Sequence, residues 1–174
     1  MIQKATKVLL KELGFDLKDP NFRQTPERVK RMWTTFCTPE PFTPTTFPLK
    51  EKTRGIIILK DHVTWGFCPH HLLPVEYTFR IGYLPSDRVL GLSKLARLAN
   101  SITSTMPLQE DIAPSVVNWL NQLLHPKGCG CTVHGKHFCT RIRGVQSPCA
   151  EAVTSVQSGI FLTDQSCRDE FLNL

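Results

Sequence analysis

The amino-acid sequence predicts an α+β protein built on an antiparallel sheet with helices packed on one of its faces. Two observations carry this prediction. The strand-like segments of the main body come in hairpin-like pairs, and two helical segments lie between the pairs. Residues 73–83 alternate between apolar and polar side chains, which is typical of a strand with one covered face.

The first part of the chain predicts two helices. Apolar residues at helical spacing indicate a helix over residues 2–14, with Gly14 as its stop. A second helix is expected from Thr25 to about Phe36. Threonine can cap this helix, and the proline and glutamate that follow suit its first turn.

A proline-rich connector follows the two helices. Four prolines within residues 38–48 disfavour a helix or a central strand there. We therefore expect residues 1–48 to form a helical arm with its connector, and residues 49–174 to form the main domain.

The main domain predicts an alternating order of strands and helices. Pro114 fits the first turn of a helix, and the alternation of residues 73–83 defines the central strand. We expect strands at residues 54–59, 73–83, 130–143 and 153–161, and helices at residues 93–104, 114–124 and 164–172.

Composition limits the classes of function. The net charge of +6 is compatible with nucleic acid, anionic lipid or a phosphorylated small substrate as partner. No dense Lys/Arg tract with interleaved aromatics occurs, so nucleic acid is disfavoured, and no apolar run reaches bilayer length, so no membrane association is expected. The start of the chain lacks a signal-peptide core, which makes a cytoplasmic location the default. The seven cysteines are then expected to be thiols or metal ligands.

Two short motifs supply potential metal ligands. Cys68-Pro69-His70-His71 lies between two predicted strands, and His137-Phe138-Cys139 lies far downstream. A Cys-x-x-His pair alone is usually a buried thiol beside a surface imidazole. If residues 137, 139, 141 and 143 occupy one strand, however, they share a face that presents imidazole, thiolate and two guanidinium groups. Three protein ligands with an open fourth position are typical of a catalytic zinc, which indicates a hydrolytic metalloenzyme.

Cys129 and Cys131 form a competing pair, because a Cys-x-Cys spacing on a strand also places both sulfurs on one face. No histidine pair accompanies them. We therefore interpret them as small packed hydrophobic residues, with a structural zinc as the less favoured alternative.

Further motifs follow one another in a fixed order along the chain: Thr25-Pro26-Glu27-Arg28, Cys68-Pro69-His70-His71, Gly91-Leu92-Ser93-Lys94-Leu95-Ala96-Arg97, Gln109-Glu110, His137-Phe138-Cys139, Arg143-Gly144-Val145 and Arg168-Asp169-Glu170-Phe171-Leu172. By these motifs the chain resembles a known family, GTP cyclohydrolase I, from about residue 20 to its end. The resemblance implies the tunnelling fold, in which subunits join their sheets into a ring, commonly two stacked pentamers with sites between subunits. It also implies conversion of GTP to 7,8-dihydroneopterin triphosphate and formate, which feeds folate, pterin or 7-deazaguanine synthesis.

The resemblance assigns a catalytic centre. Cys68, His71 and Cys139 would hold zinc (Zn²⁺), which would lower the pKa of a bound water so that hydroxide can attack carbon 8 of guanine. His70 would shuttle protons during ring opening, and His137 would act near the same carbon as a second acid/base or stabilising group. Taken alone, His70 would be an ordinary loop histidine.

The resemblance also assigns substrate-binding residues. The triphosphate would be bound at a helix N-terminus with basic side chains, which suits an anion. The guanine edge would be bound by a carboxylate that accepts from the ring N–H and the exocyclic amine. The residues that would bind the triphosphate are Ser93, Lys94, Arg97 and Arg143, with Arg28 reaching in. Glu110 would bind the guanine edge, assisted by Gln109. Without the resemblance, Ser93 would be a helix cap, Lys94 solvated surface, and Glu110 an acidic residue that favours a helix dipole.

Two departures and two rival functions remain. Pro69 stands where most members of the family have glutamate, and Arg141 adds positive charge to the predicted site face. One rival function is a nucleotide- or pterin-binding protein of the same fold without turnover. The other is a related tunnelling-fold enzyme such as a nitrile reductase, whose nucleophilic cysteine would need a different setting from this Cys-x-His-His pattern.

Overall fold

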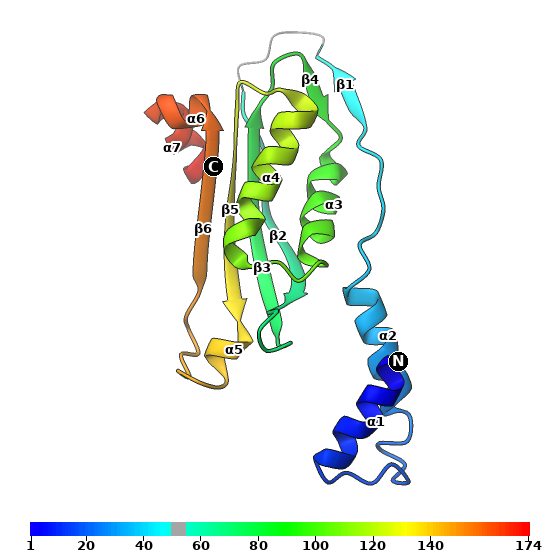
Figure 1. Cartoon of the computed structure of the whole chain (residues 1–174). Coiled ribbons are helices and arrows are strands. Elements are labelled where there is room, and N and C mark those ends of the chain that lie inside the picture. The colour runs from blue at the N-terminus through cyan, green and yellow to red at the C-terminus, as the bar shows by residue number, and fades with distance from the viewer. Residues whose placement is uncertain (50–54) are drawn as a thin grey trace. The chain divides into compact units, whose positions relative to one another are not determined.

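A computed structural model describes residues 1–49 and 55–174 of the chain (Figure 1). The described chain divides into two compact units, Met1–Thr38 and Pro39–Leu174. The division falls at the start of the proline-rich connector.

The N-terminal unit is a pair of packed helices, α1 (Ile2–Glu12) and α2 (Thr25–Phe36). Gly14 has a φ of +81°, a conformation that glycine adopts without strain, and it follows the end of α1 as predicted. The expectation that Thr25 caps α2 is wrong. Gln24 precedes the helix, and the Thr25 hydroxyl bonds back to the carbonyl of Asn21 at 3.4 Å instead.

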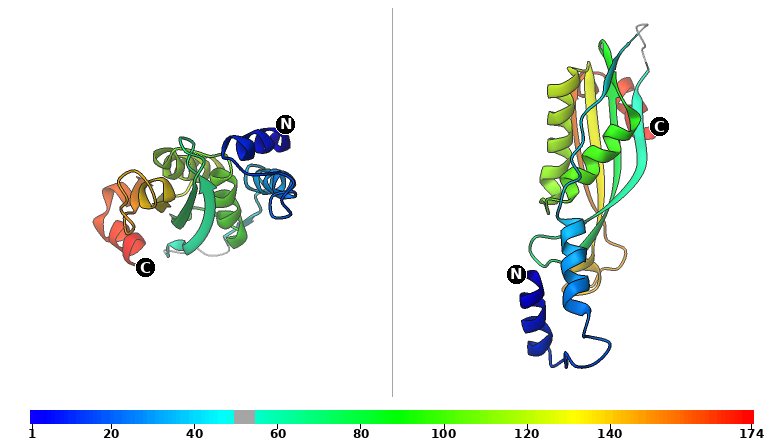
Figure 2. Two further views of the ribbon diagram at one scale, coloured as in Figure 1. Left: turned by 90° about the horizontal axis from the view of Figure 1, so that it is seen from below. Right: turned by 90° about the vertical axis from the view of Figure 1, so that its right-hand side faces the viewer.

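A four-stranded antiparallel sheet forms the centre of the second unit (Figures 1 and 2). Its strands lie in the order β2 (Ile57–Phe67), β3 (Pro74–Leu84), β5 (Gly128–His137) and β6 (Ala152–Gly159). The pairing is antiparallel throughout, which confirms the predicted α+β class with hairpin-like strand pairs.

Strand β2 is longer than the segment predicted at residues 54–59, whose first residue lies outside the described residues. The strand continues to Phe67 across an irregularity between Leu59 and His62, where Asp61 has a φ of +57°. A bulge of this kind shifts the alternation of side chains, so the apolar pattern that marks the first half of the strand does not extend into the second.

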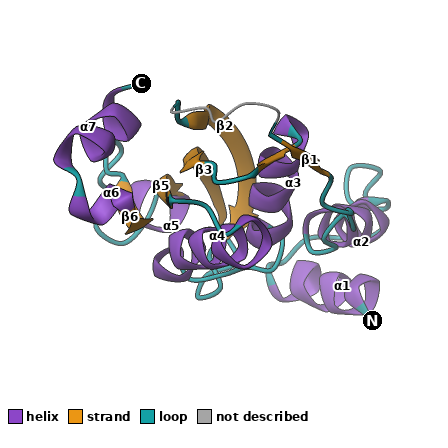
Figure 3. Cartoon of the chain, turned by 90° about the horizontal axis from the view of Figure 1, so that it is seen from above, coloured by secondary structure: helices purple, strands orange, loops and turns teal. Residues whose placement is uncertain are grey.

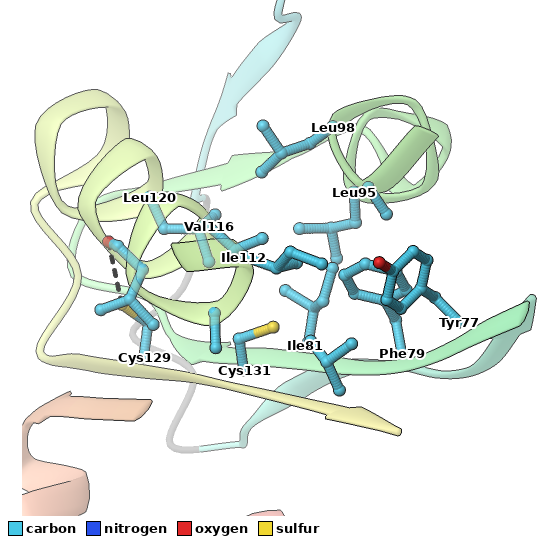
Figure 4. Close-up of a cluster of buried hydrophobic side chains, with 14 of the residues drawn as sticks. Tyr77, Phe79, Ile81, Leu95, Leu98, Ile112, Val116, Leu120, Cys129 and Cys131 are labelled. Atoms are coloured by element: carbon cyan, nitrogen blue, oxygen red, sulfur yellow. Dashed lines mark hydrogen bonds between the residues drawn. The ribbon is translucent and has the colours of Figure 1, made fainter. Parts of the chain in front are cut away.

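The core lies between one face of the sheet and two helices, α3 (Leu92–Thr103) and α4 (Gln109–Leu124). The alternation predicted for β3 is confirmed, because its apolar side chains are fully buried and point toward these helices (Figure 4). The predicted packing of Cys129 and Cys131 is also confirmed, because both are fully buried in this core. The β3 side chains in the core are Val75, Tyr77, Phe79, Ile81 and Tyr83.

Helix α4 begins earlier than predicted. Pro114 is its sixth residue and not part of its first turn, so the prediction of its start was wrong. The upstream turn is anchored by Gln109, whose buried side chain bonds to the carbonyls of Val133 and Ala152 on two strands. Near the helix start, Pro114 removes a single backbone hydrogen bond, to the carbonyl of Glu110.

Strand β5 ends earlier than predicted, at His137. Residues Phe138–Arg141 form a helical turn, α5, so the predicted strand over residues 130–143 is wrong in its last third. Pairing with β6 stops at Gly135, and pairing with β3 stops at His137. Beyond that residue no described strand continues the ladder, and the chain turns.

The C-terminal elements cover part of the opposite face of the sheet (Figure 3). The strand predicted to reach Phe161 ends at Gly159 and leads into α6 (Ile160–Thr163), while the predicted last helix is α7 (Gln165–Asn173). Phe171 of α7 stacks on Phe161 at 5.2 Å between ring centroids. A Cβ at Gly82 or Gly130, which pair across β3 and β5, would lie under 3 Å from the Phe171 ring.

The connector contributes a short strand at the margin of the second unit. Strand β1 (Thr46–Pro48) pairs antiparallel with β4 (Arg88–Leu90), apart from the main sheet. This agrees with a proline-rich segment that avoids central strands. None of the described helices combines the length and the apolar character needed to cross a bilayer.

Replacing Phe171 by alanine should destabilise the protein by about 3–5 kcal/mol, because it removes a fully buried ring. Gly82 and Gly130, which lie against this ring, have no side chains that could fill the resulting cavity. Urea unfolding followed by circular dichroism would measure the change. Leu172→Ala, at the exposed neighbour on the same helix, should change the free energy of unfolding by no more than about 0.5 kcal/mol. Equal effects of the two changes would contradict the packing described for α7.

Candidate functional site

Three potential metal ligands from two distant parts of the sequence converge at one end of the sheet. The ligand atoms of Cys68, His71 and Cys139 all lie within 4.8 Å of one another. Cys68 follows the end of β2, His71 lies in the turn before β3, and Cys139 lies in α5. The sequence predicted that the grouping would arise from a shared strand face. It arises instead from a helical turn that follows the end of β5.

The turn between β2 and β3 holds the first two ligands. The Cys68 carbonyl accepts hydrogen bonds from the amides of His71 at 3.4 Å and Leu72 at 2.9 Å, and the Cys68 amide donates to Leu73 at 2.9 Å. Leu72 has a φ of +53°, which closes the turn. A tight turn of this kind keeps a Cys-x-x-His pair on one side of the loop.

The donor set fits a tetrahedral transition metal. Two thiols and an imidazole are soft and borderline ligands. The Cys68 Sγ and His71 Nδ1 atoms are 3.6 Å apart. That separation matches the distance of about 3.6 Å expected between two ligands bound at about 2.0–2.3 Å to one tetrahedral ion. The Nδ1 atom of the neighbouring His70 lies 3.8 Å from the same sulfur.

The electrostatics of the cluster favour a cation. Burial raises the pKa of the Cys139 thiol, and the adjacent Cys68 sulfur raises it further, whereas the Arg143 guanidinium lowers it. Two sulfurs this close cannot both become thiolates at low cost unless a positive charge lies between them.

The cluster opens into a pocket of about 530 Å³. Residues from the β2–β3 turn, from the start of α4, from the end of β5 and from the segment before β6 line its walls. Among the residues that the sequence singled out, the pocket brings together Cys68, His70, His71, Gln109, Glu110, His137 and Cys139. The Glu110 side chain is exposed, in the first turn of α4.

His137 and Gln109 are tied together in this pocket. The Nε2 atom of His137 lies 2.7 Å from Oε1 of Gln109. Burial lowers the pKa of the His137 imidazole, and the nearby Glu110 carboxylate opposes that shift. The ring of Tyr77 meets the His137 ring edge-on, with centroids 6.1 Å apart.

Some predicted phosphate-binding residues lie elsewhere. Ser93, Lys94 and Arg97 do not line the pocket, and Arg97 forms a salt bridge of 3.1 Å with Glu40. They belong to the start of α3, which follows the end of β3 that is remote from the pocket (Figure 1).

Two further arginines assigned to the phosphates are not pocket residues either. Arg143 is exposed and acts on the Cys139 thiol electrostatically without lining the pocket. Arg28 belongs to the other unit, is exposed, and donates to Gln24 Oε1 at 3.1 Å.

The expectation that Arg141 adds positive charge on a strand face shared with Cys139 is wrong, because Phe138–Arg141 form a helical turn. The Nε atom of Arg141 donates to the carbonyl of Ala150 at 3.0 Å, and its Nη2 lies 3.8 Å from a carboxylate oxygen of Glu151. Because α5 is a helical turn and not a strand, Arg141 points toward the segment before β6 and fastens one wall of the pocket.

The sequence reasoning missed Tyr77 as part of the site. Its alternation predicts only a core residue, and it is indeed fully buried. Its hydroxyl has no hydrogen-bond partner among the described residues. Burial, followed by the sulfurs of Cys68 and Cys139 and the Glu110 carboxylate, raises the pKa of Tyr77 to about 12, so the hydroxyl stays protonated beneath the site.

Comparison with known proteins identifies the family. The family model for GTP cyclohydrolase I matches residues 2–174. The chain belongs to the GTP cyclohydrolase I family. Proteins named GTP cyclohydrolase 1 from Aquifex aeolicus and Sulfurihydrogenibium sp. are 35% and 33% identical to it, over 99% of this chain and 94% and 92% of theirs. The namesake from Streptococcus mutans is 32% identical, over 98% of this chain and 91% of its own.

A solved structure shares the fold of this GTP cyclohydrolase I family member. The apo crystal structure of the archaeosine synthase QueF-Like superposes with a TM-score of 0.52 and 18% sequence identity, covering 62% of this chain and 97% of that one. The predicted tunnelling-fold topology of a single chain is therefore confirmed. At this identity the likeness concerns the fold alone, and it gives no support to the rival nitrile reductase function.

Cys139→Ser should reduce the bound transition metal from about one ion per chain toward zero, because serine is a poor ligand for such ions. Inductively coupled plasma mass spectrometry of the purified protein would measure the metal content. Cys149→Ser is a matched control, since Cys149 is exposed and lies outside the cluster. A Cys139→Ser protein that retains its full metal content would refute the assignment of this cluster.

Proposed function

We propose that this protein is a zinc-dependent GTP cyclohydrolase I that converts GTP to 7,8-dihydroneopterin triphosphate and formate. The observation that carries the proposal is the Cys68–His71–Cys139 cluster opening into a pocket that also holds two further histidines and two carboxylates. Membership of the family supports the same reaction. The product class would serve folate, pterin or 7-deazaguanine synthesis.

The metal in this proposal is Zn²⁺, held by Cys68, His71 and Cys139. When bound, it would lower the pKa of a water molecule and so supply a nucleophile at neutral pH. The two sulfurs and one imidazole fit zinc better than magnesium or calcium, which prefer oxygen ligands. Three protein ligands leave a position for solvent, as in catalytic zinc sites.

Side chains of the pocket would supply binding and proton transfer. The Glu110 carboxylate, at the rim where α4 begins, would accept hydrogen bonds from the N1–H and the exocyclic amine of guanine. His70, beside the Cys68 sulfur, and His137, at the end of β5, would give and take protons while the imidazole ring of guanine opens and formate leaves.

Binding of the triphosphate would require a second copy of the chain. Ser93, Lys94 and Arg97, assigned to the phosphates, start a helix that follows the far end of β3. The eleven residues of β3 span about 36 Å, which is longer than an extended nucleoside triphosphate. We therefore infer a homo-oligomer with sites between subunits, and we keep the ring of two stacked pentamers as its proposed form.

Two more basic residues complete the proposed phosphate site. Arg143 lies within electrostatic range of Cys139 of its own chain, and Arg28 lies on the exposed side of α2. Both would pair with phosphate oxygens through charge-assisted hydrogen bonds.

The purified protein, supplied with zinc, should release formate from GTP and yield a product that fluoresces as a pterin after oxidation. A chelator should abolish turnover, and added zinc should restore it. Formate and fluorescence would be followed on one sample together with its metal content. Tight binding of GTP without release of formate would contradict the proposal and favour a non-catalytic binding protein.

Glu110→Gln should raise the KM for GTP about tenfold or more while leaving the metal content unchanged. The reason is that a hydrogen bond to a charged group contributes about 1.5–3 kcal/mol. Steady-state kinetics would measure the change. Asp111→Asn is the matched control, because Asp111 is the next residue of the same helical turn, is exposed and does not line the pocket. Similar kinetics for Glu110→Gln and the unchanged protein would exclude the guanine-binding role.

A further inference from the structure

The side chain of Gln109 lies buried across two strands of the sheet. Its Nε2 atom donates to the carbonyl oxygen of Ala152 at 3.0 Å and to that of Val133 at 3.3 Å. Only 5% of the residue is exposed. Both hydrogens of the amide group are therefore used by the backbone of β5 and β6, and none remains for a ligand in the pocket.

These two carbonyls settle the orientation of the amide. A carbonyl oxygen can only accept, so the nitrogen of the Gln109 side chain must face the strands and its oxygen must face the other way. The oxygen then points at Nε2 of His137, 2.7 Å away. Because that oxygen can only accept, Nε2 of His137 must carry a hydrogen.

A glycine makes room for this arrangement. A Cβ at Gly135 would collide with Oε1 of Gln109. Gly135 lies between Val133 and His137 on β5, opposite Tyr77 of β3. Strand β5 thus has no side chain where the Gln109 amide crosses it. The absence of a Cβ at Gly135 allows the amide oxygen to reach the imidazole of His137.

We propose that Gln109 is a positioning residue that holds His137 as its Nε2–H tautomer, so that Nδ1 is the atom that accepts and returns protons in the reaction. The inference rests on the proposed function and deepens the role of His137 in it. It also replaces the reading of Gln109 as a residue that contacts guanine, because the donors of its amide are already bonded within the sheet.

The arrangement serves both protonation states of the imidazole. Neutral His137 has a hydrogen on Nε2 and a lone pair on Nδ1. When Nδ1 accepts a proton, the resulting imidazolium still donates from Nε2 to the same amide oxygen, and that hydrogen bond becomes charge-assisted. Loss of the proton from Nδ1 restores the first state. No group other than the proton has to move, so the side chain stays in place through the cycle.

The tautomer can be measured directly. Nitrogen-15 spectra of the zinc-loaded protein with labelled histidine distinguish Nε2–H from Nδ1–H, and His137→Gln identifies the signal that belongs to His137. We expect the Nε2–H tautomer. A wild-type spectrum with the hydrogen on Nδ1 overturns the proposal whether or not the protein turns over GTP.

A pair of variants then tests the role of Gln109. Gln109→Met keeps the length of the side chain but removes all three hydrogen bonds, so His137 should lose its single tautomer. The kcat for GTP should fall about tenfold or more. This is part of the roughly 10²–10⁴-fold rate enhancement that a positioned acid–base group contributes. Gln122→Met, on the exposed side of the same helix, should match the unchanged protein in spectrum and kinetics.

The kinetic constants separate the two readings of Gln109. A lowered kcat with KM and metal content unchanged supports positioning, whereas a raised KM with kcat unchanged shows contact with substrate and overturns the inference. An unaltered tautomer in Gln109→Met also overturns it. If Gln109→Met does not fold, Gly135→Ala provides the second test, because it displaces the amide while keeping glutamine. Absence of GTP turnover in the wild-type protein, with the Nε2–H tautomer present, would count against the proposed function alone.

Discussion

The antiparallel pairing of β3 with β5 is the constraint on which the site depends. Because the two strands run in opposite directions, the start of β3 and the end of β5 lie at the same edge of the sheet, where Val75 is opposite His137. The Cys68–His71 turn precedes β3, and Cys139 follows β5. A shift of this register by one residue would turn His137 to the other face and separate the three potential metal ligands.

The core fixes that register. The β3 side chains that face α3 and α4 are fully buried, and a one-residue slip would exchange them for Glu76, Thr78 and Arg80. On the opposite face, the Phe171 ring fits only where Gly82 and Gly130 stand side by side. Packing on both faces therefore selects the one pairing that assembles the pocket.

Much of this could be predicted from the sequence, because side-chain alternation and ligand spacing are local properties. The alternation of β3, the buried pair Cys129 and Cys131, and the Cys-x-x-His turn all follow from short stretches of chain. The predictions failed where a distant partner decides the outcome. Strand β5 ends at His137 because its neighbours end there, and α4 starts before Pro114 because Gln109 bonds to two strands.

The role of Gln109 illustrates the same limit. No local pattern reveals that its amide crosses β5 at Gly135, since the two residues are far apart in the chain and meet only through tertiary structure. Tyr77 looks like any core aromatic in the sequence, whereas the structure shows a hydroxyl that has no partner among the described residues and that the sulfurs of Cys68 and Cys139 influence electrostatically. The residues that the resemblance assigns to the phosphates are harder still, because a single chain does not bring them to its own pocket.

The distance between the ligands along the chain has a consequence for folding. Cys68 and Cys139 belong to segments separated by three strands and two helices, so an ion bound to both would close a long loop. A covalent cross-link that closes a loop of this length lowers the entropy of the unfolded chain and so stabilises the folded state by about 4 kcal/mol. A bound ion would act in the same way. Metal supply in the cell would then govern how long each newly made chain survives proteolysis, in addition to how fast it works.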